Sequence, residues 1–443
     1  MGTKDTYDRK LISLGDALGL VQSGHHVVSA LAASEARTIL SELHTIQGRV
    51  EGVSVITCLP LKDYEFFTDP AMRGHFFHEA WFYSPGIRTA HREARTCSFI
   101  PNHLHAAGSD RLAFRKPDIF FGSCTPPNRH GYVSLSLSAT YEREMIDAAA
   151  FAVMEVNENL PFTYGDTIIH IDEIDHFVES HRSLPQLPAA EPSEKDRAIG
   201  AYINDLIQDG STLQLGIGGI PNAVATALLE KKDIGIHTEM FTDGMVDLYH
   251  AGVISRVPHA IRERVLSGKM VATFALGTQK LYDFLDHNPA VAMMQGAWVN
   301  DPYVISRNQR QVSINTALEV DLVGQVSSET IGSSQFSGTG GQADTAIGAQ
   351  MSDGGKSFIA LYSTANVRQP DGTRKRKSKI VAAFEKGTCV TLHRANVDYV
   401  VTEYGVVRLK GCSVRERVER LISIAHPDFR DELAGEAEHM QLI

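Results

Sequence analysis

The chain has 443 residues, of which 43% are hydrophobic and 21% are charged. This length is too great for a single hydrophobic core, so we expect two domains. The formal net charge of −11 argues against general binding to nucleic acid or to an anionic membrane, although it is compatible with a local cationic pocket for an anionic ligand. The composition also lacks the signatures of disordered, fibrous and disulfide-rich proteins.

The cysteines and the N-terminal residues indicate a cytoplasmic protein. The five cysteines form no CxxC pair, and their odd number fits reduced thiols. Residues 1–10 are polar and lack the apolar core of a secretory signal, and no later run has the length that spans a bilayer. We therefore expect no membrane partner.

Short apolar strands alternate with amphipathic helices along the chain, which predicts mostly parallel sheets with helices outside. Residues 22–43 predict a helix end at a glycine, a strand, a loop of small residues and a helix, and residues 208–230 repeat this order. The proline-rich residues 183–195 predict a boundary between domains at 1–186 and 187–443. Because open α/β sheets bind ligands beyond the carboxyl ends of their strands, the loops that follow strands are the candidate sites.

Two clusters in the first domain carry polar side chains that are able to bind ligands. The histidines of HFFHEA at 75–80 and NHLH at 102–105 have spacings open to metal binding, but no HExxH motif or Cys/His set accompanies them, so we expect no metal. Arg88, Arg92 and Arg95 lie at helical spacing. A solvated surface is the default interpretation of these arginines, and binding of a substrate carboxylate is the alternative.

The segment LGIGGIPNAV, residues 215–224, follows a predicted strand and begins a predicted helix. Gly216, Gly218 and Gly219 would let the backbone approach a ligand closely, and the free N–H groups of a helix start would face an anion. The pattern is neither the GxGxxG dinucleotide fingerprint nor a P-loop. A tight turn without a ligand explains it equally well.

One carboxylate, Glu239, falls in the apolar stretch IGIHTEMF at 234–241, near the predicted carboxyl end of a strand. Neither alternating face of this stretch is polar, so we expect Glu239 to be at least half enclosed. An enclosed carboxylate is costly unless it is paired, protonated or functional. Pairing with an arginine and a catalytic role are equally weighted on these grounds.

Asn315 and a second glycine cluster follow. Asn315 lies within the apolar residues 313–326, where its amide must find a hydrogen-bond partner and is either structural or directed at a substrate carbonyl. The segment QFSGTGGQAD at 335–344 cannot be a regular helix or strand, and it predicts either an anion or oxyanion loop or a flexible surface loop. Its glycines are Gly338, Gly340 and Gly341.

The basic run Arg374–Lys379 follows the turn sequence QPDG. A solvated hairpin or loop is its simplest interpretation, and contact with a phosphate is the alternative. The sequence contains no GxSxG nucleophile elbow, which argues against a serine hydrolase.

Taken in order, these motifs resemble the acetyl-CoA hydrolase/transferase family, in the branch of the 4-hydroxybutyrate and butyryl-CoA:acetate CoA-transferases. The resemblance rests most strongly on the segments LQLGIGGIPNAV, GIHTEMFTDGMVDL, ATFALGTQKLYDFL, SINTALEVDLVGQV and QFSGTGGQAD. The match extends through nearly the whole chain. The resemblance implies an α/β fold of two similar open-sheet domains, with the active site in the cleft between them. It also implies a homodimer or higher homo-oligomer without a metal or a permanently bound cofactor.

The resemblance assigns roles to residues as well. It implies that Glu239 is the catalytic glutamate and that Asn315 contributes to the oxyanion site. Coenzyme A and acyl-CoA are implied as substrates, together with a small carboxylate. The residues implied to contact CoA are Gly216, Ile217, Gly218, Gly219, Ile220, Gly338, Gly340 and Gly341.

The implied reaction moves CoA between short-chain carboxylic acids by a ping-pong mechanism through a glutamyl-CoA thioester on Glu239. The branch suggests acetate, butyrate and 4-hydroxybutyrate, whereas the arginines at 88–95 favour a dicarboxylate such as succinate or itaconate, and both possibilities stay open. Water attacking the same intermediate would make the chain an acyl-CoA hydrolase, which is the nearest alternative. A non-catalytic CoA-binding protein and a sugar-phosphate isomerase are the remaining ones.

Overall fold

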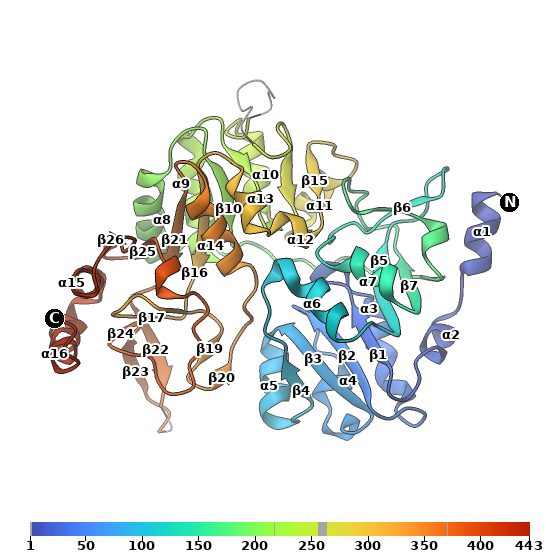
Figure 1. The fold of residues 1–443 in the computed structure, drawn as a ribbon. Coiled ribbons are helices and arrows are strands. Elements are labelled where there is room, and N and C mark those ends of the chain that lie inside the picture. The colour runs from blue at the N-terminus through green and yellow to red at the C-terminus, as the bar shows by residue number, and fades with distance from the viewer. Residues whose placement is uncertain (1, 217, 256–263, 370) are drawn as a thin grey trace.

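The computed structural model describes residues 2–216, 218–255, 264–369 and 371–443. Two α/β halves lie side by side, an N-terminal half up to residue 180 and a C-terminal half from residue 193 (Figure 1). Each half contains a mainly parallel sheet, as the alternation of strands and helices predicted. Within the described residues, no helix has the length and apolar character needed to cross a membrane.

The sheet of the N-terminal half has the order β4-β3-β2-β1-β5-β7-β9, and its pairings are parallel. Its central strands β1 and β5 are buried along their whole length, as expected of parallel strands covered on both faces. The strands are β1 His26–Ser29, β2 Val53–Cys58, β3 Phe76–Phe82, β4 Cys97–Phe99, β5 Ile119–Cys124, β7 Phe151–Val156 and β9 His176–Glu179. The helices are α1 Thr3–Lys10, α2 Leu14–Gly19, α3 Arg37–Glu42, α4 Glu65–Thr68, α5 Pro85–Glu93, α6 Ala107–Phe114 and α7 Glu142–Ala148.

The sheet of the C-terminal half has the order β11-β10-β16-β21-β25-β26, and only the edge strand β26 pairs antiparallel. Its strands are β10 Thr212–Leu215, β11 Gly235–Ile236, β16 Gln311–Thr316, β21 Lys356–Ala360, β25 Tyr399–Thr402 and β26 Gly405–Arg408. The helices of this half are α8 Glu194–Leu206, α9 Gly219–Ala227, α10 Asp243–His250, α11 Gln279–Leu285, α12 Gly296–Val299, α13 Pro302–Ser306, α14 Gln342–Met351, α15 Val414–Ile424 and α16 Arg430–His439.

Smaller ladders connect the loops around the two sheets. Short parallel pairs join β12 Met240–Phe241 to β14 Phe274–Ala275, and β13 Met270–Ala272 to β15 Val291–Met293. Antiparallel pairs join β6 Tyr132–Ser134 to β8 Ile168–His170, β19 Thr330–Ile331 to β20 Ser334–Gln335, and β22 Thr364–Arg368 to β23 Arg374–Ser378. A last sheet contains β17 Glu319–Asp321, β18 Val326–Ser327 and β24 Ile380–Val381.

The two halves are built on one plan, which confirms the predicted fold of two similar open-sheet units. Five strands follow the same spatial order in each half, β2-β1-β5-β7-β9 in the first and β11-β10-β16-β21-β25 in the second. In this alignment the loops after β1 and β10 correspond, as do the loops after β2 and β11. A helix precedes β1 and β10, as the repeated pattern in the sequence predicted.

The apolar core is shared between the halves. One buried cluster extends from Val28 and Phe120 in the first sheet to Ile314 and Phe358 in the second, and each half also has a cluster of its own. The predicted domain boundary at 186/187 falls in residues 180–193, which contain no helix or strand, and the division stays a prediction.

The strand expected over residues 234–241 is interrupted. It consists of β11 and β12, and residues 237–239 lie between them. His237 makes a single parallel bridge to Val271, while the carbonyl of Glu239 accepts the N–H groups of Thr273 and Phe274. The chain therefore turns from one ladder to another at Glu239, which the apolar pattern of the sequence did not reveal.

Candidate active site

A cleft of about 460 Å³ lies where the loops of the two halves meet. The N-terminal half lines it with residues that follow β1, β2 and β3, and the C-terminal half with residues that follow β10 and β16. Ligands of open α/β sheets bind at such strand ends, so the cleft is the expected site. From the first half, the lining includes Leu31, Cys58, Leu59, Trp81, Phe82 and Arg88, and from the second Gly216, Glu239, Met240, Phe274, Asn315 and Gly338 to Gln342.

Glu239 is the one acidic side chain among the described residues that line this cleft. Asn300 Nδ2 donates a hydrogen bond of 3.1 Å to Glu239 Oε2, and the backbone N–H of Gly341 also donates to this carboxylate. The two bonds come from the residue after α12 and from the residue before α14. The carboxylate is thus held by two donors, neither of which is a cation.

The pKa of Glu239 is raised to about 7, chiefly because burial disfavours the charged form. The Asn300 hydrogen bond opposes this shift, the charge of Asp344 adds to it, and the Gly341 N–H opposes it. A carboxyl group that titrates near neutrality in a cleft has the property expected of a catalytic group. The alternative of structural pairing with an arginine finds no support, since the hydrogen-bond partners of this carboxylate among the described residues are an amide and a backbone N–H.

The second glycine cluster packs directly against Glu239. A Cβ atom on Gly341 would lie 2.0 Å from Glu239 Oε2 and 2.1 Å from Asn300 Nδ2, so any larger residue there would displace one of these two side chains. A Cβ atom on Gly338 would lie 2.3 Å from the carbonyl oxygen of Trp81 in the other half. Gly340 has a φ of +54° and its carbonyl accepts the N–H of Leu104. These three glycines line the cleft, so the segment is not a free surface loop, and its contact with a ligand stays a prediction.

The first glycine segment reaches the cleft only at its start. Gly216 follows β10 and lines the cleft, whereas Ile217 lies outside the described residues. Gly218 is exposed with a φ of +116°, Gly219 begins α9, and Ile220 is 5% exposed in the core. None of these last three lines the cleft, so the predicted CoA contacts at Gly218, Gly219 and Ile220 stay predictions about the backbone beside it.

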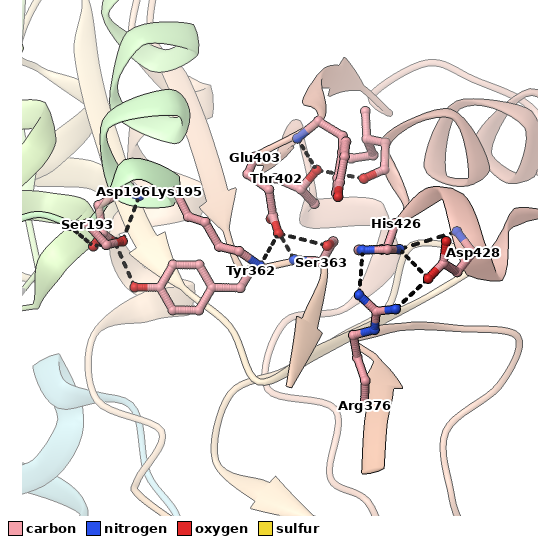
Figure 2. A network of polar contacts seen from close by, with 12 residues as sticks. Ser193, Lys195, Asp196, Tyr362, Ser363, Arg376, Thr402, Glu403, His426 and Asp428 are labelled. Atoms are coloured by element: carbon pink, nitrogen blue, oxygen red, sulfur yellow. Dashed lines mark hydrogen bonds and ion pairs between the residues drawn. The ribbon is translucent and has the colours of Figure 1, made fainter. Parts of the chain in front are cut away.

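A polar network fixes the chain beside this segment (Figure 2). The Tyr362 hydroxyl donates to Asp196 at 2.7 Å, and Lys195 pairs with Glu403 at 2.7 Å. A Cβ atom on Gly219 would lie 2.6 Å from the Asp196 carboxylate. The network therefore joins α8 to the ends of β21 and β25 and sets where α9 begins.

Asn315 lines the cleft at the end of β16, as expected. Its Nδ2 donates to Ser313 Oγ at 2.9 Å and to Thr345 Oγ1 at 3.0 Å. These two bonds use both amide hydrogens, so in this arrangement Asn315 turns its carbonyl oxygen, and not a donor, to other partners. Its predicted part in an oxyanion site stays a prediction.

The arginine and histidine clusters separate in space. Arg88 lines the cleft, donates to the carbonyl oxygen of Phe336 at 2.6 Å and stacks on the Phe336 ring, whereas Arg92 and Arg95 are exposed. Within the described residues, no group of three or more metal-ligating side chains is present. Within the basic run Arg374–Lys379, residues Arg374–Ser378 form β23 of a hairpin, in which Arg376 contacts His426 and Asp428 (Figure 2).

Sequence reasoning missed Asn300 as a candidate site residue. Asn300 is fully buried, and its Oδ1 has no hydrogen-bond partner among the described residues. An unsatisfied buried acceptor costs about 1–3 kcal/mol, so the amide is poorly explained by folding and well explained by its contact with Glu239. The segment VNDPYVI around it was available as a signal, but the amide lies 61 residues from the glutamate it contacts.

Comparison with known proteins finds similarity in both halves of the chain. The family model for the acetyl-CoA hydrolase/transferase N-terminal domain matches residues 1–187, and the model for the C-terminal domain matches residues 277–437. The chain is 41% identical over 437 residues to a succinyl-CoA:cyclohexane-1-carboxylate CoA transferase of Geobacter metallireducens, covering 99% of this chain and 97% of the relative. It is 38% identical over 437 residues to the 4-hydroxybutyrate coenzyme A transferase of Clostridium kluyveri, covering 98% and 99%. The crystal structure of RipA from Yersinia pestis is similar over 100% of both chains, with a TM-score of 0.90 at 33% identity.

Proposed function

Since this chain belongs to the acetyl-CoA hydrolase/transferase family and is a CoA-transferase, we propose that Glu239 is the nucleophile that carries CoA between two carboxylic acids. The observation that carries this proposal is the environment of Glu239. It is the one acid among the described residues of a cleft between the halves, and two neutral donors hold its carboxylate. A carboxylate is a suitable nucleophile because the glutamyl-CoA thioester that it forms has an energy similar to that of the donor and product thioesters.

The proposed reaction has two equivalent halves. Glu239 attacks the thioester carbonyl of the donor, which releases CoA thiolate and leaves a mixed anhydride. The thiolate then attacks the glutamyl carbonyl, so the free donor acid leaves and a glutamyl-CoA thioester remains. The acceptor carboxylate attacks that thioester, and the released thiolate takes the acceptor acyl group from the new anhydride. No water, metal or nucleotide triphosphate is consumed, and the kinetics are ping-pong.

Each attack on the glutamyl carbonyl places a negative charge on its oxygen. Asn300 Nδ2 and the Gly341 N–H already donate to the Glu239 carboxylate, so they are placed to stabilise that oxyanion without reorganisation. Removal of one such donor costs roughly 10²–10³-fold in rate. Asn315 is proposed to contribute at the substrate carbonyl, for which its amide must turn away from Ser313 and Thr345.

CoA is proposed to enter as a substrate and to leave as a product, with no cofactor bound permanently. The segments proposed to contact it are Gly216 to Ile220 and Gly338 to Gly341. The division into domains at 1–186 and 187–443, a homodimeric or higher assembly, and a cytoplasmic location belong to the same proposal.

The lining of the cleft bears on the acyl group. The lining of the cleft includes apolar side chains such as Leu31, Trp81, Met240 and Phe274, which suit a short acyl chain. Arg88 is the one cationic side chain among the described residues of the lining, and it supports the alternative of a dicarboxylate. We propose a short-chain acyl group as the substrate class, with Arg88 as the group that decides between mono- and dicarboxylates.

Trapping of the thioester tests the nucleophile. The enzyme is incubated with acyl-CoA, reduced with borohydride and digested, and we expect the modification on Glu239 and its loss in Glu239→Ala. Glu438→Gln, an exposed residue of α16, is the control and should react fully. Full turnover by Glu239→Ala, or a modification at another residue, would overturn the proposal.

An acceptor screen tests the reaction and the substrate class. CoA transfer that depends on added carboxylate supports a transferase, whereas equal release of free CoA without an acceptor supports the hydrolase alternative. In Arg88→Leu, a loss of rate with succinate and itaconate but not with acetate, butyrate and 4-hydroxybutyrate assigns the arginine to a second carboxylate. An equal loss with every acceptor assigns it to CoA instead.

A further inference from the structure

A turn from the N-terminal half reaches across and holds the start of α14. The His105 ring Nδ1 lies 2.8 Å from Asp344 Oδ1, and the His105 backbone N–H donates to Asp344 Oδ2 at 3.2 Å. The neighbouring Leu104 N–H donates to the carbonyl oxygen of Gly340 at 3.1 Å. The N-terminal half is therefore hydrogen-bonded to the segment that contains Gly341, whose N–H donates to Glu239.

Asp344 occupies an unusual position for a buried acid. Its side chain is 2% exposed, in the first turn of α14. An acid at this position commonly bonds back to the residue that caps the helix, but here the cap is Gly341 and the carboxylate turns to the other half instead. It also brings a second negative charge close to Glu239, which makes the nucleophile harder to ionise. A charge with that effect requires a compensating group.

We propose that His105 is a positioning residue of this reaction: its imidazolium balances the charge of Asp344, and so favours the ionised form of Glu239. The inference rests on the proposed role of Glu239 as the nucleophile. Because His105 and Asp344 belong to different halves, the pair exists only where the halves are packed as the cleft requires. The arrangement thereby links assembly of the cleft to the ionisation of its nucleophile.

The charges around His105 all favour its protonated form. The hydrogen bond to Asp344 raises the pKa of His105, burial opposes this, and the charges of Asp344, Asp301 and Asp110 add to the increase. His103 stacks on His105 with ring centroids 5.9 Å apart, and its Nδ1 lies 3.7 Å from Asp344 Oδ1. A second imidazole is thus available to the same carboxylate, although it is 51% exposed.

The groups around Glu239 are different in kind. Asn300 and the Gly341 N–H are neutral donors, Asp344 is an anion, and the Cys58 thiol is a further neighbour on β2. Burial raises the pKa of Cys58 well above its ordinary value, so this thiol is neutral and supplies no charge. Among these neighbours, the charges beside Glu239 therefore come from the His105–Asp344 pair.

Opposite changes to the two partners test the inference. His105→Gln keeps a donor for Asp344 but removes the positive charge, so the acid limb of the kcat/KM–pH profile should move to higher pH. Asp344→Asn removes the negative charge, so the limb should move to lower pH. A shift of half to one pH unit changes kcat/KM at pH 6 by about three- to tenfold. The double variant should behave like Asp344→Asn, because without the acid the imidazole has nothing to balance.

The matched control is His181→Gln, since His181 pairs with Glu158 at 3.0 Å on the surface and lies outside the cleft. Its acid limb should stay in place. A purely structural role predicts lower thermal stability in His105→Gln and Asp344→Asn with the limb unmoved, and shifts of the same sign in both would also overturn the inference. If His105→Gln does not fold, His105→Asn takes its place, because it also keeps a donor and removes the positive charge.

The failure of this inference is distinguishable from failure of the proposed function. Borohydride trapping on Glu239, together with unmoved acid limbs, would refute the role of His105 and leave the nucleophile intact. A trapped residue other than Glu239 would refute both.

Discussion

Replacement of Gly341 by alanine tests whether the contact between this glycine and Glu239 sets the rate. The backbone at Gly341 has φ −99° and ψ 14°, values that alanine adopts without strain, so the loop itself should keep its shape. The added Cβ atom would lie 2.0 Å from Glu239 Oε2 and 2.1 Å from Asn300 Nδ2. Ordinary contacts are about 3.5–4.0 Å, so the nucleophile or its donor must move by more than about 1 Å.

A displacement of about 1 Å in a catalytic group costs about 10²-fold in rate, or about 2.7 kcal/mol in the activation barrier. We therefore expect kcat/KM of Gly341→Ala to fall at least 10²-fold, with the yield of borohydride-trapped enzyme falling in parallel. The assay compares steady-state CoA transfer, trapping and thermal unfolding on the same preparations.

Gly435→Ala is the matched control, because Gly435 lies in α16, is exposed, and has nothing within 4 Å of an added Cβ atom. This variant should keep full activity and gain up to about 1 kcal/mol of helix stability. The reasoning is refuted if Gly341→Ala folds normally and retains kcat/KM within about threefold of the unaltered enzyme.

Three further predictions follow from the same site. The kcat/KM of the unaltered enzyme should fall tenfold per pH unit below an apparent pKa of about 7, because Glu239 attacks only as the anion; a pH profile with that limb absent would contradict it. Glu239→Gln should abolish transfer and raise the melting temperature more at pH 8 than at pH 5, since a carboxyl whose pKa is raised by folding stabilises the fold at low pH and loses that contribution as pH rises through about 7. Asn300→Ala should lower kcat by about 10²–10³-fold, and Asn315→Ala by less, because Asn300 donates to Glu239 and Asn315 does not; steady-state kinetics that reverse this order would contradict the assignment.

The interrupted strand around Glu239 shows where sequence reasoning reached its limit. The apolar residues 234–241 correctly indicated an enclosed carboxylate, because an enclosed strand region needs apolar neighbours on both faces. They did not indicate that the chain changes ladders there, since β12 pairs with β14, whose residues lie more than thirty positions further along. Pairing with a distant strand leaves no periodic mark in the local sequence.

The two glycine clusters were equivalent in the sequence and differ in the structure. Gly338, Gly340 and Gly341 line the cleft, while Gly218, Gly219 and Ile220 stand beside it. Each cluster predicted that the backbone approaches a neighbouring group closely, because glycine has no side chain to prevent it. The side chain that packs against each glycine is decided by the tertiary structure. It is Asp196 at Gly219 and Glu239 at Gly341.

The sequence by itself determined the α/β class, the repeated unit, the family and the enclosed Glu239, because strand and helix periodicity and motif order are written along the chain. Only the tertiary structure decided which groups meet that carboxylate. Asn300 lies 61 residues from Glu239, and His105 lies 239 residues from Asp344. These contacts follow from the order of strands in two sheets and from the packing of one half on the other, so side chains far apart in sequence converge at the strand ends that face the cleft.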